Sequence, residues 1–178
     1  MYTEKTIGSK PLFSGKVINL RKDTVTLPNG QTATREVVEH PGGVSIVAQK
    51  EDGKVLLVRQ YRRPFDKEMI EIPAGKLEYG EDHYTCGLRE LQEETGYKAG
   101  NYQYLGGFYP TPGFCNEIIH IYFASELTKG EMHLDEDEFL DVIEADVDKV
   151  FAMIETGEIT DGKTIIGILL SKQRGYLK

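Results

Sequence analysis

The chain has 178 residues and a mass of 20.1 kDa, the size of one compact domain with a small additional element. A formal net charge of −8, with no Lys/Arg cluster longer than two residues, argues against nucleic-acid binding. No apolar run approaches the roughly 18–20 residues of a membrane helix, and two cysteines exclude a disulfide scaffold. We therefore expect no membrane partner, no signal peptide and a reduced, cytoplasmic location.

The first 41 residues predict a small β-element. Alternating residues flank Asn29–Gly30, and an Asn-Gly pair between two alternating runs is a strong β-hairpin signal. Residues 15–40 are expected to form strands and turns, which end at Pro41–Gly42–Gly43. We assign residues 1–41 to an N-terminal β-strand element and residues 42–178 to the main domain.

The main domain alternates between β-strand and helix patterns. A helix is expected over residues 83–95, because apolar positions recur with helical spacing and Gly96 follows as a stop signal. The other expected elements are strands at 44–48, 54–60, 69–72, 102–107 and 117–124, and helical segments at 147–154 and 164–172. Hairpin strands with one central helix and terminal helices predict a layered α/β fold.

The central helix carries three neighbouring carboxylates. Glu90 and Glu94 are four residues apart and share one face, expected to lie opposite or oblique to the apolar stripe, and Glu93 lies beside them. Their mutual repulsion destabilises the helix, and a divalent cation such as Mg²⁺ would offset it. The alternative is an ordinary solvated helix face.

The spacing around this helix is specific. Gly75 is followed after five residues by Glu81, and after seven more by Arg-Glu-Leu-Gln-Glu-Glu-Thr-Gly-Tyr at 89–97. This arrangement resembles the Nudix box at every fixed position, except that Tyr97 replaces the usual aliphatic residue. The resemblance implies a Nudix-type α/β/α sandwich with a mixed sheet and a metal-dependent pyrophosphohydrolase activity.

Residue roles follow from the same resemblance. The implied metal ligands are Glu90 and Glu94, with Glu93 and Glu81 as further ligands or supporting groups, and the carbonyl of Ala74. Arg89 is expected to orient the glutamates by hydrogen bonds. Mg²⁺ is the expected cofactor, with Mn²⁺ as a possible substitute, and the cation would polarise phosphorus and acidify the attacking water.

Residues outside the box resemble the ADP-ribose pyrophosphatase subfamily. Pro112 lies 16 residues past Gly96 in a Pro-Gly-Phe loop. The segments Gln60–Pro64 and Glu71–Gly75 resemble the Gln-x-Arg and Glu-x-Pro-Ala-Gly segments of that subfamily. The implied substrate-binding residues are Arg62, Arg35, Glu71 and Gly113. An arginine fork suits the diphosphate or terminal ribose, although a solvated pair is the alternative for Arg62 and Arg63. Tyr2, Phe13 and Arg35 are open candidates for contact with the adenine.

An acidic stretch supplies the candidate base. Residues 131–144 contain seven acidic residues and no Lys or Arg, which on composition alone is typical of a solvated loop. Glu138 opens a Glu-Phe-Leu-Asp-Val segment that resembles the one after the catalytic loop of ADP-ribose pyrophosphatases. Glu138 is the first choice for the general base and Glu136 the second, while Asp141 replaces the subfamily's second glutamate and has a doubtful role.

The expected function is Mg²⁺-dependent hydrolysis of ADP-ribose to AMP and ribose 5-phosphate by a homodimer that exchanges or packs its N-terminal strands. One alternative is a hydrolase for GDP-mannose or another nucleoside diphosphate sugar. A second is a non-catalytic sensor of ADP-ribose or NAD-like ligands. The intact set Glu90, Glu93 and Glu94 argues against the sensor, which needs no water-activating metal.

Overall fold

The computed structural model describes residues 2–78, 80–136 and 138–178 and divides the chain into two compact units. The first unit contains residues from 1–42 and 109–118, and the second contains residues 43–108 and 119–178. The segment 109–118 thus groups with the N-terminal unit, although the sequence analysis placed it within the main domain.

The first unit is an antiparallel three-stranded sheet in the order β1-β2-β3. Its strands are β1 (Lys5–Ser14), β2 (Asn19–Thr26) and β3 (Thr32–Glu39). The predicted Asn29–Gly30 turn joins β2 to β3, and Gly30 has a positive φ of 83° that glycine adopts without strain. Segment 109–118 joins this unit through the backbone N–H of Val38, which donates to the Phe114 carbonyl at 2.8 Å.

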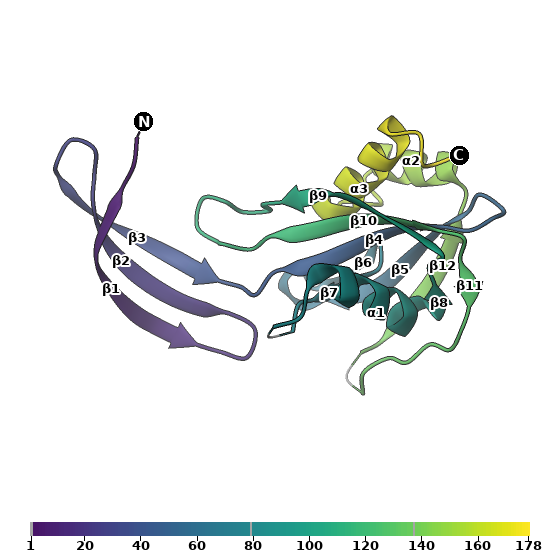
Figure 1. The fold of residues 1–178 in the computed structure, drawn as a ribbon, viewed down its shortest axis with the longest axis horizontal. Helices are drawn as coiled ribbons and strands as arrows, with labels where there is room; N and C mark the ends of the chain where they lie inside the picture. The colour runs from purple at the N-terminus through teal and green to yellow at the C-terminus, as the bar shows by residue number, and fades with distance from the viewer. Residues whose placement is uncertain (1, 79, 137) are drawn as a thin grey trace. The chain divides into compact units, whose positions relative to one another are not determined.

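The second unit is built on a mixed sheet, for which seven strands are found among the described residues, with the path β12-β5-β4-β10-β9 (Figure 1). β10 runs parallel to β4, and the other pairs in this sheet are antiparallel. Off the main path, β6 pairs with β5 and β7 pairs with β4. The strands are β4 (Gly43–Gln49), β5 (Val55–Arg62), β6 (Lys67–Glu71), β7 (Ala74–Lys76), β9 (Asn101–Phe108), β10 (Ile119–Ser125) and β12 (Leu140–Ala145). The remaining elements are the 3₁₀ turn η1 (Arg63–Phe65), a small ribbon of β8 (Tyr97–Lys98) and β11 (Thr128–Lys129), and the helices α1 (His83–Thr95), α2 (Val147–Glu155) and α3 (Gly162–Gln173).

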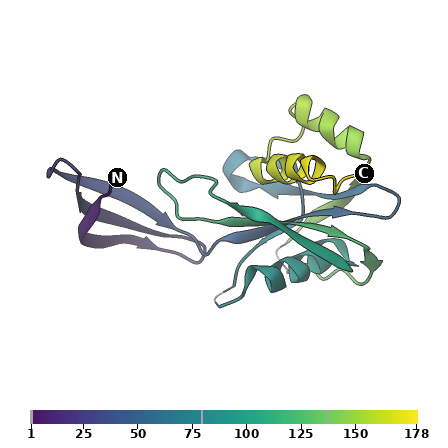
Figure 2. The same ribbon diagram turned by 45° about the horizontal axis from the view of Figure 1, so that its top comes forward.

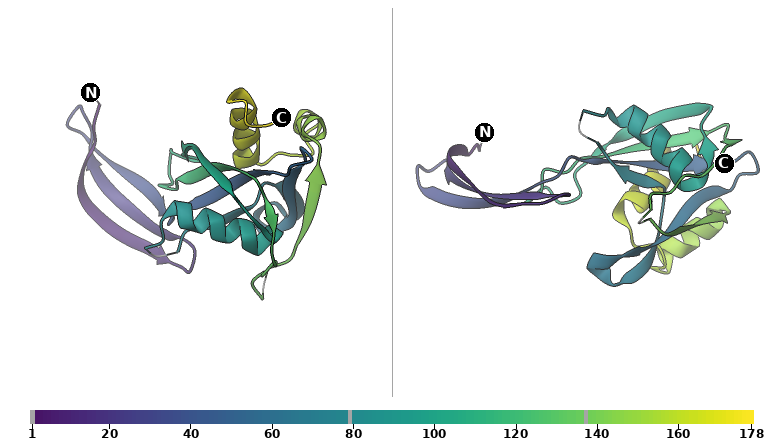
Figure 3. Two further views of the ribbon diagram at one scale, coloured as in Figure 1. Left: turned by 45° about the vertical axis from the view of Figure 1, so that its right-hand side comes forward. Right: turned by 90° about the horizontal axis from the view of Figure 1, so that it is seen from below.

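Helices cover both faces of this sheet, as the predicted α/β/α sandwich requires. All seven residues of β4 are buried, and their side chains alternate between the two faces. Ile46 packs in one apolar cluster with Leu91 of α1, whereas Val47 packs in another with Ile168 of α3. Figure 2 shows α1 on one side of the sheet and α2 and α3 on the other, and Figure 3 shows the same layers from two further directions. In the part of the chain that the structure describes, no helix combines the length and apolar character needed to cross a membrane.

The central helix has the predicted bounds. The side chain of Asp82 caps its start by accepting from the backbone N–H groups of Tyr84 and Thr85 at 3.0 and 3.1 Å, and Gly96 ends it in the left-handed conformation. The alternative of a solvated helix face does not hold for Glu94, because only 1% of this residue is exposed.

Strands β1 and β12 were not predicted. Every residue of β1 is exposed, so no buried face imposes alternation on its sequence. β12 lies in the acidic stretch, and it is specified by pairing with β5, which places Leu140 opposite Gln60. Tertiary pairing rather than local composition defines both strands.

Helix α3 approaches the sheet closely at one glycine. A Cβ atom at Gly167 would lie 2.8 Å from Cγ2 of Val47, a stiff side chain inside the core, whereas a Cβ at Gly162 in the same helix would meet nothing within 4 Å. Gly167→Ala should therefore lower the free energy of unfolding by about 1 kcal/mol, because overpacking outweighs the gain in helix propensity. Gly162→Ala is the matched control and should be neutral or slightly stabilising in urea denaturation. Equal stability of the two variants would contradict the close contact.

Candidate active site

Strand β7 and helix α1 meet at a glycine without space for a side chain. A Cβ at Gly75 would lie 1.8 Å from Cδ of Glu90, so the backbone there lies directly against the Glu90 carboxylate. One residue earlier, the backbone N–H of Ala74 donates to Oε2 of Glu94 at 2.8 Å. The structure therefore brings together four predicted residues: Ala74, Gly75, Glu90 and Glu94.

Arg89 organises a carboxylate of the same helix, Glu93, and one just before it, Glu81. Its Nε and Nη2 atoms donate to the two oxygens of Glu81, each at 3.0 Å, and Nη1 donates to Glu93 at 2.7 Å. Nη1 also lies 2.9 Å from Oε1 of Glu90. A bidentate guanidinium fork of this kind fixes carboxylate orientation more tightly than a single charged donor does. Arg89 thus holds Glu81 and Glu93 and touches Glu90, as its predicted orienting role requires.

Glu90 and Glu94 are short of compensating charge. Burial raises the pKa of Glu90 to about 7, and Arg89 only partly opposes this shift. Burial likewise raises the pKa of Glu94 to about 8 against the hydrogen bond from Ala74, with the charges of Glu138 and Glu90 adding to the shift. Near neutral pH, Glu94 is therefore mostly protonated and Glu90 partly so, and a cation would displace these protons.

These residues fit a hard divalent cation that completes its shell with other ligands. Within the described ranges, no three His, Cys, Asp or Glu side chains are already placed to hold one ion together. Mg²⁺ is usually bound through one or two carboxylates, several waters and substrate phosphates. The buried pair Glu90 and Glu94 beside the Ala74 backbone matches that sparse ligand set.

The segment before β12 brings Glu138 to this cluster. The backbone N–H of His133 donates to the Glu93 carbonyl at 3.1 Å, which ties the segment to the end of α1. Glu138 is partly buried, and its charge raises the pKa of both Glu90 and Glu94. Burial raises the pKa of Glu138 itself, with the charges of Asp135 and Glu93 adding to the shift. Glu136 is exposed, and Asp137 lies outside the described residues.

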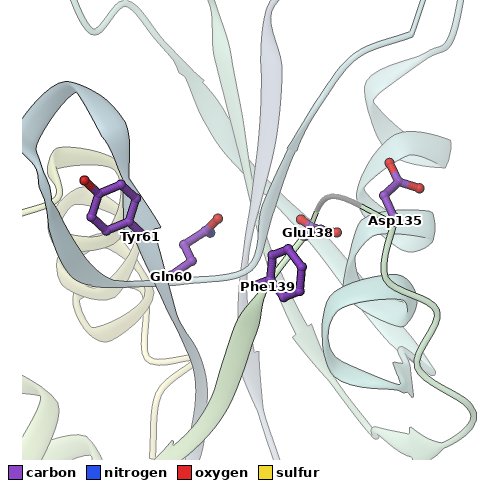
Figure 4. A pocket seen from close by; sticks show the side chains of 5 residues that line it. All are labelled: Gln60, Tyr61, Asp135, Glu138 and Phe139. Atoms are coloured by element: carbon purple, nitrogen blue, oxygen red, sulfur yellow. The ribbon is translucent and has the colours of Figure 1, made fainter.

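A pocket of about 390 Å³ opens beside Glu138 (Figure 4). The residues lining it come from β5 and from the segment that leads into β12: Gln60, Tyr61, Asp135, Glu138 and Phe139. Phe139 is 81% exposed and Tyr61 is 51% exposed, so both rings present accessible apolar surface at this pocket. The pocket combines aromatic surface with acceptors next to the carboxylate cluster, and sequence patterns alone did not single out Gln60, Tyr61 or Phe139 as lining residues.

Arg62 forms an ion pair with the buried carboxylate of Glu71. Nε and Nη2 of Arg62 donate to the two Glu71 oxygens, each at 2.7 Å, and Glu71 is only 1% exposed. Lys163 also donates to Glu71, and it donates to Asp161 at 2.9 Å. Burial alone would raise the pKa of Glu71, but these two cations lower it to about 2. Glu71 therefore serves as a counter-ion to both cations. The sequence did not point to Lys163, because no motif marks it.

The two remaining predicted substrate contacts belong to the first unit. Nε of Arg35 on β3 donates to Glu4 at 3.0 Å, so this guanidinium is already paired within its own sheet. Gly113 lies in a turn, and a side chain at this position would meet nothing within 4 Å.

Comparison with known proteins matches both parts of the chain. The model of the NUDIX domain matches residues 39–165, and that of the nucleoside diphosphate sugar hydrolase N-terminal domain matches residues 4–38. The chain is also similar to a crystal structure described as an ADP compounds hydrolase, with a TM-score of 0.85 and 19% identity, over 97% of this chain and 96% of that one. This likeness shows a shared fold.

Three relatives align over most of their length. A methanol dehydrogenase activator of Bacillus methanolicus is 48% identical over 100% of this chain and 97% of the relative. An ADP-ribose pyrophosphatase of Bacillus subtilis is 45% identical over 93% of this chain and 90% of the relative. A GDP-mannose pyrophosphatase of Yersinia enterocolitica is 36% identical over 94% of both. With its box, its sandwich fold and these matches, the chain belongs to the Nudix hydrolase family.

Proposed function

We propose that this protein is a Mg²⁺-dependent pyrophosphohydrolase that cleaves ADP-ribose to AMP and ribose 5-phosphate. The observation that carries the proposal is the pair of buried Glu94 and largely buried Glu90, held against the Ala74–Gly75 backbone with too little positive charge around it. A divalent cation and its diphosphate ligand supply the missing charge balance. Divalent-metal dependence is general among Nudix hydrolases.

Each nearby side chain then has a defined task. Glu90 and Glu94, with the Ala74 carbonyl, would hold Mg²⁺, which would neutralise the diphosphate and acidify the attacking water. Glu138 would accept a proton from the attacking water as the general base. Arg62 binds the diphosphate or the terminal ribose, and Arg89 keeps Glu81, Glu90 and Glu93 in place.

The relatives direct the choice of substrate. The relative with 45% identity is named for ADP-ribose, and the GDP-mannose pyrophosphatase has 36% identity. ADP-ribose is therefore the first candidate and GDP-mannose the second. A non-catalytic sensor is disfavoured. A sensor needs no metal to activate water, so it would gain nothing from carboxylates whose burial costs stability.

A substrate panel tests this proposal directly. With Mg²⁺, ADP-ribose should be hydrolysed with a higher kcat/KM than GDP-mannose or other nucleoside diphosphate sugars, and excess EDTA should abolish turnover. Glu94→Gln should lower kcat by orders of magnitude, because it removes a charge that holds the cation. Products are read by chromatography of AMP. The proposal of metal-dependent hydrolysis would be refuted if turnover were undiminished in excess EDTA. It would also be refuted if Glu94→Gln turned over ADP-ribose as fast as the wild type.

The two candidate bases are separated by a pair of matched variants. Glu138→Gln should lower kcat by roughly 10²–10⁴-fold with little change in KM, because a general base acts mainly in the transition state. Glu136→Gln is the control from the same segment and should change kcat by less than about threefold. If Glu136→Gln were the more damaging, the assignment within the segment would be wrong. If neither mattered, the metal and the box glutamates alone would activate the water.

We further propose that the protein is a cytoplasmic homodimer in which residues 1–41 form the dimerisation element. Two unpaired cysteines suit a reducing compartment. The three-stranded sheet is a poor independent fold, since Val25 is the one buried hydrophobic side chain described within residues 2–41. Its exposed apolar side chains include Ile7, Leu12, Phe13 and Val17.

Light scattering should therefore give about twice the chain mass of 20.1 kDa. Phe13→Asp combined with Ile7→Asp should shift the protein toward monomer, because charges at an apolar interface are costly to bury. Lys16→Ala, an exposed position in the same unit, is the control and should leave the mass unchanged. A fully active wild-type monomer would rule out this assembly.

A further inference from the structure

A chain of four alternating charges runs from helix α3 to the end of strand β5. Lys163 lies in the first turn of α3 and donates to both Asp161 and Glu71. Glu71, at the end of β6, accepts from Arg62 at the end of β5. The order is Asp161, Lys163, Glu71, Arg62, with the Glu71 carboxylate between the two cations. Lys163 and Glu71 are 92 residues apart in sequence, so the network joins distant segments of the chain.

The middle of this chain is removed from solvent. Glu71 is 1% exposed, and the side chain of Lys163 is 13% exposed. Removing one partner of a buried charge pair leaves the other charge poorly compensated, so such networks hold their members in fixed positions. Asp161 is fixed in turn, because it also caps α3 by accepting from the backbone N–H of Thr164 at 3.0 Å.

Arg62 lies near Glu94 and Glu138, and part of its guanidinium is uncommitted. Its charge acts on Glu94 and Glu138, opposing the rise in the pKa of each. Glu71 takes Nε and Nη2, and within the described part of the chain no protein acceptor is found for Nη1. Two N–H groups of Nη1 are therefore available to an anionic ligand at the cluster.

Lys163 changes how much positive charge Arg62 presents. With Lys163 present, the charges of Arg62, Glu71, Lys163 and Asp161 sum to zero, so Nη1 of Arg62 can attract an anion without a surplus of negative charge behind it. Without Lys163, the remaining charges of Arg62, Glu71 and Asp161 sum to −1, which disfavours an approaching diphosphate.

We propose that Lys163 is a positioning residue for diphosphate recognition: through Glu71 it holds the Arg62 fork in place and leaves the charge of Arg62 available to the ligand. The inference deepens the proposed function and rests on it for the identity of the substrate. In the proposed role Lys163 does not touch the ligand, so its effect on ligand binding depends on Arg62.

A double-mutant cycle tests that dependence. The variants are Lys163→Met, Arg62→Ala and the double variant, with Lys163→Arg as the charge-conserving rescue. Lys172→Met, which removes an exposed lysine from the same helix, is the control. Two quantities are measured with Mg²⁺ present: KM and kcat for ADP-ribose, and the dissociation constant of inorganic pyrophosphate by calorimetry. The second readout does not require turnover.

Lys163→Met should raise KM and the pyrophosphate dissociation constant by about tenfold, with kcat reduced less than about threefold. Lys163→Arg should restore most of the loss, and Lys172→Met should match the wild type. In the Arg62→Ala background, Lys163→Met should add less than about a twofold effect. If Lys163→Met prevents folding, Lys163→Gln, which keeps a hydrogen-bond donor without the charge, is expected to give the same binding loss.

Full additivity of the two substitutions would overturn the inference, because Lys163 would then act independently of Arg62. An unchanged pyrophosphate dissociation constant in Lys163→Met or Lys163→Gln would overturn it as well. If the wild type fails to hydrolyse ADP-ribose but the pyrophosphate cycle shows the expected non-additivity, the proposed substrate is wrong and the role of Lys163 stands.

Discussion

The candidate site depends on two carboxylates, Glu90 and Glu94, which lie one helical turn apart and are largely shielded from water. Glu90 and Glu94 gain little from this placement alone, since burial disfavours their charged forms and they repel each other. The surrounding sequence accommodates them. Gly75 lacks the side chain that would collide with Glu90, and the backbone N–H of Ala74 satisfies one oxygen of Glu94. A site that a fold tolerates at such a cost is typical of functional chemistry rather than of packing.

Positive charge is distributed around this pair in an informative way. Arg89 binds Glu81 and Glu93 and touches Glu90, while Arg62 is engaged by Glu71. No arginine fork closes on Glu94 within the described residues, where its direct partner is the Ala74 N–H. The two cations therefore frame the carboxylate pair without neutralising it, which leaves the charge balance to a metal ion and its anionic ligand.

Much of this arrangement could be predicted from sequence, because local signals fix it. The bounds of α1 follow from Asp82 and Gly96 at its ends, and the box spacing identified Ala74, Glu90 and Glu94. The burial of Glu94 could not be predicted. Helical periodicity indicates only which residues share a face of the helix, and not that strand β7 packs against the face that carries Glu94. The Glu71–Lys163 contact was hidden for a related reason: it joins segments 92 residues apart that no shared motif links. Strand β12 was obscured by its acidic composition, since its pairing with β5 is a long-range contact.

Proton binding links the carboxylate pair to the stability of the fold. A folded-state pKa of about 7 for Glu90 and about 8 for Glu94, against an ordinary value of 4.5, means that the folded protein holds protons that the unfolded chain has already released. Stability of the metal-free protein from these groups is therefore fully present below about pH 4.5 and is lost as pH rises through 7 and 8. Glu71 acts in the opposite direction: its pKa of about 2 contributes stability above its ordinary value of 4.5 that is lost toward acid. A cation that replaces the protons on Glu90 and Glu94 removes the alkaline loss, so metal binding, proton release and folding are one coupled equilibrium at this site.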